Sequence, residues 1–200
     1  MDFNAQANHW DTGRRKQRAK QISALIREKL EFTGDEVLLD YGCGTGLISF
    51  NLSQGVGTVV GYDSSLQMLE VFNSKIDSNK ILSTNSLESY NNHFDCVVSS
   101  MVFHHIMNLD EALDDVYRIM KVDGKLLIVD LDLDDGSFHR DELDFKGHNG
   151  FERNQFKSLV ESHGFACIEL ETALRDNKRS DDKELQYSLF YLYAKKVDRI

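Results

Sequence analysis

The chain has 200 residues, of which 41% are hydrophobic and 28% charged, and its formal net charge is -10 at pH 7. This length and composition support one hydrophobic core of ordinary size and are typical of a soluble globular domain. The acidic balance argues against nucleic acid as a partner, because phosphate backbones would be repelled. The three cysteines, Cys43, Cys96 and Cys167, are widely spaced without a CxxC pair, so we expect buried thiols rather than disulfides or a zinc site.

The N-terminal residues are polar and aromatic, unlike a signal peptide, and no apolar run reaches the roughly 18 residues that a membrane span needs. We therefore expect a cytoplasmic protein with no membrane contact. A basic cluster follows, made up of Arg14, Arg15, Lys16, Arg18 and Lys20. Because no aromatic residue interleaves these side chains, we interpret them as the solvated face of a helix rather than as a nucleic-acid patch.

Short apolar runs alternate with helical patterns along the chain. The spacing of apolar residues predicts a helix over residues 13–31, and further helices after positions 46, 65 and 108. Buried strands are expected over residues 37–40, 58–62, 80–83, 94–99 and 125–131. An acidic loop then precedes a helix that ends at Gly164, a strand over residues 166–170, a polar loop over residues 171–184 and a last strand over residues 187–194.

This alternation of strands and helices favours a largely parallel sheet that is covered on both faces. Sheets of this kind bind ligands beyond the carboxyl ends of their strands. A glycine-rich turn lies at that position after the first strand, where Gly42, Gly44 and Gly46 alternate before a helix. Glycine lets the backbone turn sharply there and approach a ligand closely, which indicates a nucleotide-like ligand.

A dinucleotide fingerprint would need glycine at position 47, which is Leu47. The run from Val37 through Asp40 to Gly46 instead resembles the first motif of class I S-adenosylmethionine-dependent methyltransferases. Asp63 is similar to that family's acidic residue after the second strand, and residues 94–99 resemble its fourth-strand motif. The resemblance extends over residues 7–195.

The resemblance implies a fold, which is a Rossmann-like three-layer αβα sandwich. Its seven-stranded sheet would be mostly parallel, with the order 3-2-1-4-5-7-6 and an antiparallel last strand. It also implies a single methyltransferase domain over residues 1–200, onto which residues 1–32 pack as a helical cap.

The resemblance further implies that the cofactor is S-adenosylmethionine. The glycine loop would hold its amino-acid end and Asp63 its ribose, while Met68 either contacts the adenine or belongs to the core. Asn85 stands where the family often has an aspartate that meets the adenine amino group, and an amide oxygen can accept the same bond. The expected cofactor-binding residues are Asp40, Gly42, Cys43, Gly44, Gly46, Asp63, Ser64, Met68, Asn85, Ser86, Ser99 and Phe103.

Methyl transfer is an in-line displacement that needs alignment, exclusion of water and sometimes removal of a proton, so it requires no covalent residue. His104, His105 and His148 are candidate general bases, because imidazole titrates near neutral pH. Alternatively, one histidine of the adjacent pair packs under the cofactor and the other faces solvent or caps a helix. No spacing of Asp and His supports a metal site.

Two further segments have alternative interpretations. Residues 130–144 contain the acidic side chains Asp130, Asp132, Asp134, Asp135, Asp141, Glu142 and Asp144. They form either a solvated loop or a mouth that attracts cationic or amine acceptors, with Phe138 and His139 beside it. Near the N-terminus, Trp10 is either a lid over the cofactor or a staple for the first helix.

We therefore expect a methyltransferase that acts on a small molecule, because the chain carries little beyond a catalytic core. A nucleic-acid acceptor is less favoured, since Ser99 and Ser100 replace the proline pair usual in family members that methylate exocyclic amines. The alternatives are a protein methyltransferase, a non-catalytic cofactor-binding sensor or partner subunit, and a nicotinamide dehydrogenase on a similar sheet. The oligomeric state stays open.

Overall fold

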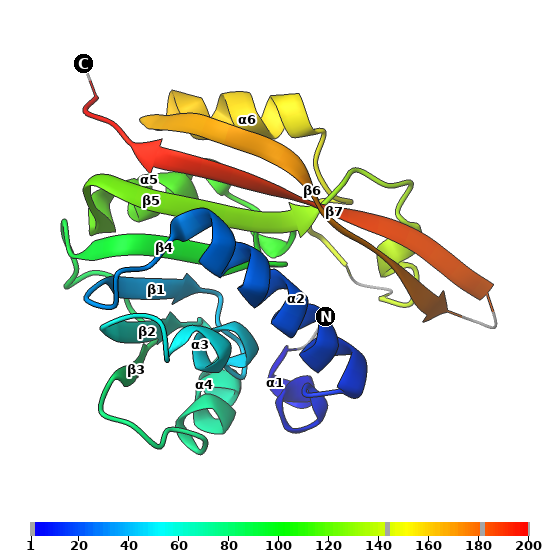
Figure 1. The fold of residues 1–200 in the computed structure, drawn as a ribbon. Coiled ribbons are helices and arrows are strands. Elements are labelled where there is room, and N and C mark those ends of the chain that lie inside the picture. The colour runs from blue at the N-terminus through cyan, green and yellow to red at the C-terminus, as the bar shows by residue number, and fades with distance from the viewer. Residues whose placement is uncertain (1–2, 143–144, 181–182, 200) are drawn as a thin grey trace.

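The computed structural model describes residues 3–142, 145–180 and 183–199, and a seven-stranded sheet runs through this part of the chain (Figure 1). The strands are β1 (Val37–Tyr41), β2 (Thr58–Tyr62), β3 (Ile81–Thr84), β4 (Phe94–Ser100), β5 (Met120–Leu131), β6 (Phe165–Ser180) and β7 (Lys183–Lys196). They lie in the order β3-β2-β1-β4-β5-β7-β6, with β7 antiparallel to both neighbours and the other pairs parallel. The predicted order and the antiparallel last strand are confirmed.

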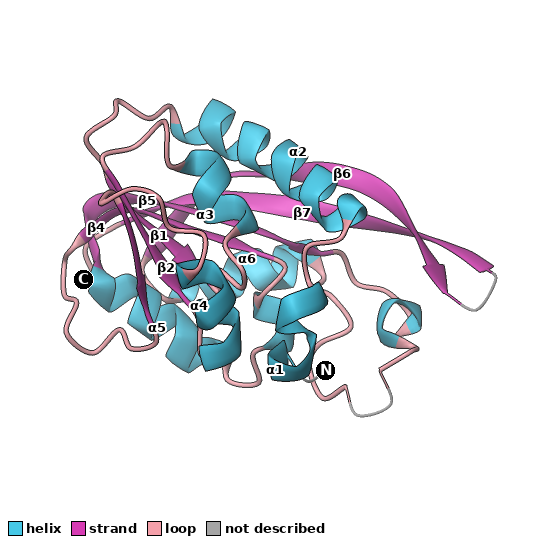
Figure 2. Cartoon of the chain, turned by 90° about the horizontal axis from the view of Figure 1, so that it is seen from below, coloured by secondary structure: helices cyan, strands magenta, loops and turns pink. Residues whose placement is uncertain are grey.

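Helices cover both faces of the sheet (Figures 1 and 2). The α-helices are α1 (Phe3–Gln6), α2 (Gly13–Leu30), α3 (Leu47–Leu52), α4 (Leu66–Asn73), α5 (Leu109–Ile119) and α6 (Arg153–Ser162). Short 3-10 helices are η1 (Ala7–His9), η2 (Phe103–His105) and η3 (Ser137–His139). None of the helices in the described ranges combines the length and apolar character needed to cross a membrane.

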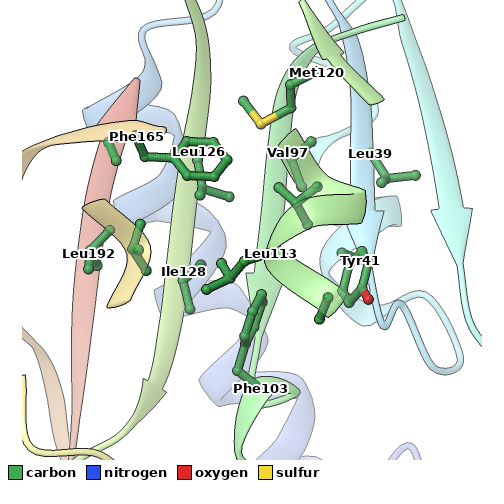
Figure 3. Packing of buried hydrophobic residues seen from close by; sticks show 14 of the residues in the cluster. Leu39, Tyr41, Val97, Phe103, Leu113, Met120, Leu126, Ile128, Phe165 and Leu192 are labelled. Carbon is green, nitrogen blue, oxygen red and sulfur yellow. The ribbon is translucent and has the colours of Figure 1, made fainter. Parts of the chain in front are cut away.

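Two apolar layers form because successive strand side chains point to opposite faces. On one face, Leu38 and Val98 pack with Ile22 and Ile26 of α2. On the other face, side chains of β1, β4 and β5 pack against α5 and α6, as Figure 3 shows around Leu113. The sheet is therefore buried on both sides, and its open strand ends are where a ligand can approach.

The strands β6 and β7 correct one prediction. Residues 171–184 were expected to be a loop because they are polar, but the described residues among them pair in a two-stranded arm, with Arg175 opposite Ser188 and Asn177 opposite Gln186. Figure 2 shows this arm extending beyond the helical layers. Polar residues suit an arm whose faces meet solvent. Asp176 ties the arm to α2 by accepting a bond from Arg14 (3.1 Å), and it accepts a second bond from Tyr187 within the arm (2.7 Å).

The N-terminal segment is fixed near the glycine-rich turn. Asp11 accepts hydrogen bonds from the Thr45 hydroxyl (2.5 Å) and the Lys75 ammonium group (2.6 Å). Thr12 then caps α2 by accepting a bond from the Arg15 amide. These contacts hold the chain before α2 against the carboxyl ends of the strands.

Gly61 of β2 offers a test of this packing. A Cβ atom there would lie 2.7 Å from the Phe72 ring and 2.9 Å from the Cys43 sulfur. We expect Gly61→Ala to lower the free energy of unfolding by about 1–3 kcal/mol, measured by urea denaturation, because two buried groups must move. Gly13→Ala is the control, since no atom lies within 4 Å of its added Cβ. Equal stability of the two variants would contradict the close packing of α4 on β2.

Candidate functional site

The glycine-rich turn has a backbone that only glycine adopts readily. Gly42, Gly44 and Gly46 have φ angles of +78°, +53° and +89°. The amides of Gly42 and Cys43 donate to the Tyr62 carbonyl (2.8 and 2.9 Å), which holds the turn against the end of β2. A Cβ at Gly42 would lie 2.4 Å from Val102, whereas at Gly44 its nearest neighbours would be Trp10 Nε1 at 3.8 Å and Met68 Sδ at 4.0 Å. Gly44 therefore leaves open space beside the turn.

Two carboxylates flank this turn. Asp40 is buried at the end of β1 and accepts bonds from the Ser49 hydroxyl (2.6 Å) and amide (3.0 Å). Burial nevertheless raises the pKa of Asp40 to about 6. Asp63 accepts bonds from the Gly44 amide (2.7 Å) and the Ser65 amide (2.8 Å), and burial raises its pKa as well. Each Asp63 oxygen keeps a lone pair for a further donor such as a hydroxyl group.

A cavity of about 410 Å³ opens between this turn and α2, within the range typical of small-molecule sites. It lies beyond the carboxyl ends of β1, β2 and β4. The expected cofactor residues that line it are Asp40, Gly42, Cys43, Gly44, Asp63, Ser64 and Met68. Its aromatic and thioether side chains, including Trp10, Tyr62 and Met68, offer flat apolar contacts, and its carboxylates suit hydroxyl or cationic groups.

Five expected cofactor residues do not line this cavity. Gly46 packs under the Phe50 and Phe72 rings. Ser99 is buried and donates to the Tyr41 carbonyl (3.0 Å), and Phe103 is buried against Tyr41. These three residues lie behind the cavity lining and shape it from there.

The remaining two of these residues, Asn85 and Ser86, are exposed just after β3. Ser86 bonds Thr84 in a local turn. Asn85 lies with Leu66 and Asn73 in a separate, shallow surface hollow. The structure therefore separates both residues from the glycine-rich turn.

The basic cluster at the start of α2 corrects a second interpretation in part, because Lys16 and Lys20 are exposed as expected but the three arginines are not. Arg14, Arg15 and Arg18 are half-buried rather than on a solvated face, and Arg15 and Arg18 line the first cavity. The Arg15 guanidinium lies 3.8 Å from the centre of the Trp10 ring. The sequence contained a signal for this orientation, since Arg15 and Arg18 precede Ala19 and Ile22 by four residues each on the apolar stripe of the helix.

A second cavity, of about 290 Å³, adjoins the first. Both cavities share the lining residues Phe3, Trp10, Arg15, Arg18, Met101 and His105. The second cavity is completed by Thr12, Arg14, His104, Phe138, His139, Glu142, Lys178 and Tyr187. Trp10 therefore lines both cavities, and the hairpin arm contributes Lys178 and Tyr187 to the lining of the second cavity.

The three histidine candidates have different surroundings. His104 is buried, and its Nδ1 lies 2.5 Å from Asp130 Oδ1. His105 lines both cavities, and burial followed by repulsion from the neighbouring histidines lowers its pKa to about 2, so it is neutral at physiological pH. His148 lines neither cavity and donates from Nε2 to the Ile106 carbonyl (2.9 Å). Neither member of the adjacent pair faces solvent.

The acidic segment does not form a mouth of free carboxylates. Asp132 pairs with Arg153 through two bonds (2.6 and 2.7 Å), and Asp134 accepts the amides of Gly136 and Phe138. Among the described residues, Glu142 is the acidic side chain of this segment that lines either of the two adjoining cavities, and Asp144 lies outside the described residues. Most of these carboxylates are therefore engaged in turn hydrogen bonds or ion pairs. In the described ranges no group of three or more potential ligands could hold a metal ion.

Comparison with known proteins agrees with this architecture. A protein-family model described as a methyltransferase domain matches residues 14–170. An uncharacterised methyltransferase of Schizosaccharomyces pombe is 31% identical over 182 residues, covering 80% of this chain and 64% of that protein. A demethylmenaquinone methyltransferase of Lactobacillus johnsonii is 27% identical over 114 residues, covering 52% of this chain and 47% of that protein. The chain thus spans about half to two thirds of the length of these relatives.

A solved structure shows the same fold. The crystal structure of an S-adenosylmethionine-dependent methyltransferase from Aquifex aeolicus matches with a TM-score of 0.73 and 17% identity, over 97% of this chain and 98% of that one. Since the family model also covers more than half of the sequence, the chain belongs to the methyltransferase-domain family, among the class I S-adenosylmethionine-dependent methyltransferases.

Proposed function

We propose that this chain transfers the methyl group of S-adenosylmethionine to a small-molecule acceptor. The observation that carries the proposal is the pair of adjoining cavities at the carboxyl ends of the strands, one with the chemistry of the cofactor and one beside it. The relative named as a demethylmenaquinone methyltransferase acts on a small molecule and supports this acceptor class. We also propose that residues 1–200 act as one domain, with residues 1–32 packed on it.

The first cavity fits the cofactor by its chemistry. Asp63 has oxygens that can accept ribose hydroxyls, and Gly44 has no side chain where a ligand would approach. Asp40 and Asp63 supply negative charge near the positively charged groups of the cofactor. When bound, the cofactor supplies an electrophilic methyl group. The chain itself aligns the acceptor and excludes water through Phe3 and Trp10.

The function is tested by following a radiolabelled methyl group. Purified protein is incubated with labelled S-adenosylmethionine and a cell extract that has been separated into small molecules and macromolecules. We expect label in the small-molecule fraction. Label in the protein fraction alone would indicate a protein methyltransferase, and saturable binding of S-adenosylhomocysteine without any transfer would indicate a sensor.

Gly44→Ala tests the placement of the cofactor. The added methyl group would project into the first cavity, so we expect the affinity for S-adenosylhomocysteine to fall at least about tenfold in calorimetry. Gly34→Ala is the matched control, because Gly34 also has a positive φ, of +103°, and no atom lies within 4 Å of its added Cβ. Equal affinity in the two variants would place the ligand elsewhere.

Asp40 predicts a pH dependence of cofactor binding. Its pKa is raised to about 6, so the carboxyl takes up a proton as the pH falls from 7 to 5 and loses its attraction for a cation. We expect the affinity for S-adenosylmethionine to fall about tenfold over this interval, because binding favours the ionised form. Asp40→Asn should flatten the profile. Methylthioadenosine, which lacks both cationic groups, should bind equally at the two pH values; a parallel fall for this ligand would refute the role of Asp40.

A further inference from the structure

The second cavity contrasts with the acidic chain around it. Four cationic side chains line it, those of Arg14, Arg15, Arg18 and Lys178, together with one carboxylate, Glu142. The chain as a whole has a net charge of -10, so this basic lining is a local feature that α2 and the hairpin arm create by folding together.

Two of these cations form no ion pair with another residue of the described ranges. Arg14 pairs with Asp176 at 3.1 Å, and Lys178 lies 3.8 Å from Asp141. Arg15 instead bonds the Trp10 carbonyl, Arg18 bonds the Tyr187 hydroxyl, and neither forms an ion pair within the described part of the chain. Burial, and then the positive charge of Arg18, lower the pKa of Arg15, while the nearby carboxylates of Glu142 and Asp11 oppose this shift without reversing it. The site therefore favours an anionic group on its ligand.

His104 supplies a second, independent feature. Its side chain is 1% exposed and that of Asp130 is 0% exposed, and Asp130 lies 2.5 Å from Nδ1. In the neutral ring the Nδ1 hydrogen goes to this carboxylate, which leaves the lone pair on Nε2. Nε2 has no hydrogen-bond partner among the described residues, although His104 lines the second cavity. A buried acceptor without a partner is costly, so a donor from a ligand is expected there.

His104 also lies beside a residue that lines both cavities. Its ring centre is 4.1 Å from that of His105, which lines both spaces. Aromatic side chains make up much of the remaining lining, with Phe138 and Tyr187 in edge contact at 5.0 Å. The basic groups, the aromatic side chains and His104 thus line one small space.

We propose that the second cavity binds the methyl acceptor, that this acceptor is a small hydroxylated aromatic acid, and that Nε2 of His104 takes the proton from its hydroxyl group. Arg15 and Arg18 provide the charge that holds the acid group, and the same charge repels acceptors that carry an ammonium group. Asp130 is a positioning residue, because it orients the imidazole and stabilises its protonated form.

This proposal rests on the proposed methyltransferase function, and the reaction is a transfer of the methyl group to the hydroxyl oxygen of the acceptor. The hydroxyl oxygen of the acceptor bonds to the methyl carbon, and the bond from that carbon to the cofactor sulfur breaks with its electron pair passing to sulfur. The hydroxyl proton ends on Nε2 of His104, so the products are a methyl ether and a neutral thioether.

A binding experiment tests the charge selection without requiring turnover. Protein saturated with S-adenosylhomocysteine is titrated in a calorimeter with 3- and 4-hydroxybenzoate, with the corresponding hydroxybenzamides and with tyramine. We expect at least one acid to bind about tenfold or more tightly than its amide, and tyramine to bind most weakly. Arg18→Gln should remove the preference for the acid, whereas Lys20→Gln, an exposed change on the same helix, should keep it.

The outcomes of this titration separate the two proposals. Failure of S-adenosylhomocysteine to bind would overturn the proposed function itself. Binding of S-adenosylhomocysteine with no preference for the acids would overturn only the acceptor class. If Arg18→Gln weakens the binding of S-adenosylhomocysteine and leaves the acid preference intact, the arginine serves the cofactor and the assignment is wrong.

Transfer to the acid that binds best tests the role of His104. We expect His104→Gln to lower kcat at least about 100-fold with the affinity for that acid retained, and His93→Gln, an exposed histidine change, to have no effect. The form of the same acid that carries a nitro group ortho to the hydroxyl, which is then already ionised at pH 8, should be methylated at similar rates by both variants. A loss by His104→Gln that persists with this acceptor would show a structural role and overturn the base assignment.

The positioning role of Asp130 is tested separately, by comparing rates with the parent and the nitro-substituted acid. We expect Asp130→Asn to lower kcat for the parent acid without changing its affinity, and the nitro-substituted acid to restore the rate, because the imidazole is then not needed as a base. An equal loss of rate with both acceptors would refute the positioning role.

Discussion

The contact between the glycine-rich turn and the end of β2 is the constraint on which the site depends. The amides of Gly42 and Cys43 bond the Tyr62 carbonyl, and the Gly44 amide bonds Asp63, so the backbone of the turn is held at two adjacent positions. Val102 closes against Gly42 from the segment after β4, where a side chain on the glycine would collide with it. Because β1, β2 and β4 are thereby brought together, the open space beside Gly44 has a defined shape.

The distribution of charge follows from which groups find partners. Asp132 forms an ion pair with Arg153, and Asp134 accepts hydrogen bonds from backbone amides. Asp130 is hydrogen-bonded to His104. These carboxylates stabilise turns and orient other side chains, so they contribute little field to the cavities. Among the described residues that line the second cavity, the charged side chains are mostly cationic, and Arg14, Arg15 and Arg18 come from α2. The net charge of the whole chain therefore does not describe the electrostatic potential inside the second cavity.

The hairpin arm joins parts of the chain that are distant in sequence. The Tyr187 hydroxyl accepts a hydrogen bond from Arg18 and donates one to Asp176. Asp176 also accepts a hydrogen bond from Arg14. The arm thereby fixes the orientation of two arginines and brings Lys178 beside Phe138. An exposed two-stranded ribbon is marginal by itself, and these contacts with α2 and η3 give it support.

The sequence alone determined the glycine-rich turn and the carboxylates at 40 and 63, since these depend on local periodicity and on glycine's access to positive φ. The order of the strands followed from the resemblance of these motifs to a known family, not from local periodicity. The tertiary structure decided which side chains reach the cavities. It turned Arg15 and Arg18 inward, because they share the apolar stripe of α2, and it paired the polar residues of β6 with β7, which no local pattern specifies. It also left Ser99 and Phe103 behind the lining and Asn85 outside it. Partner choice among charged groups depends on distances between segments far apart in the chain, and a linear pattern contains no such distances.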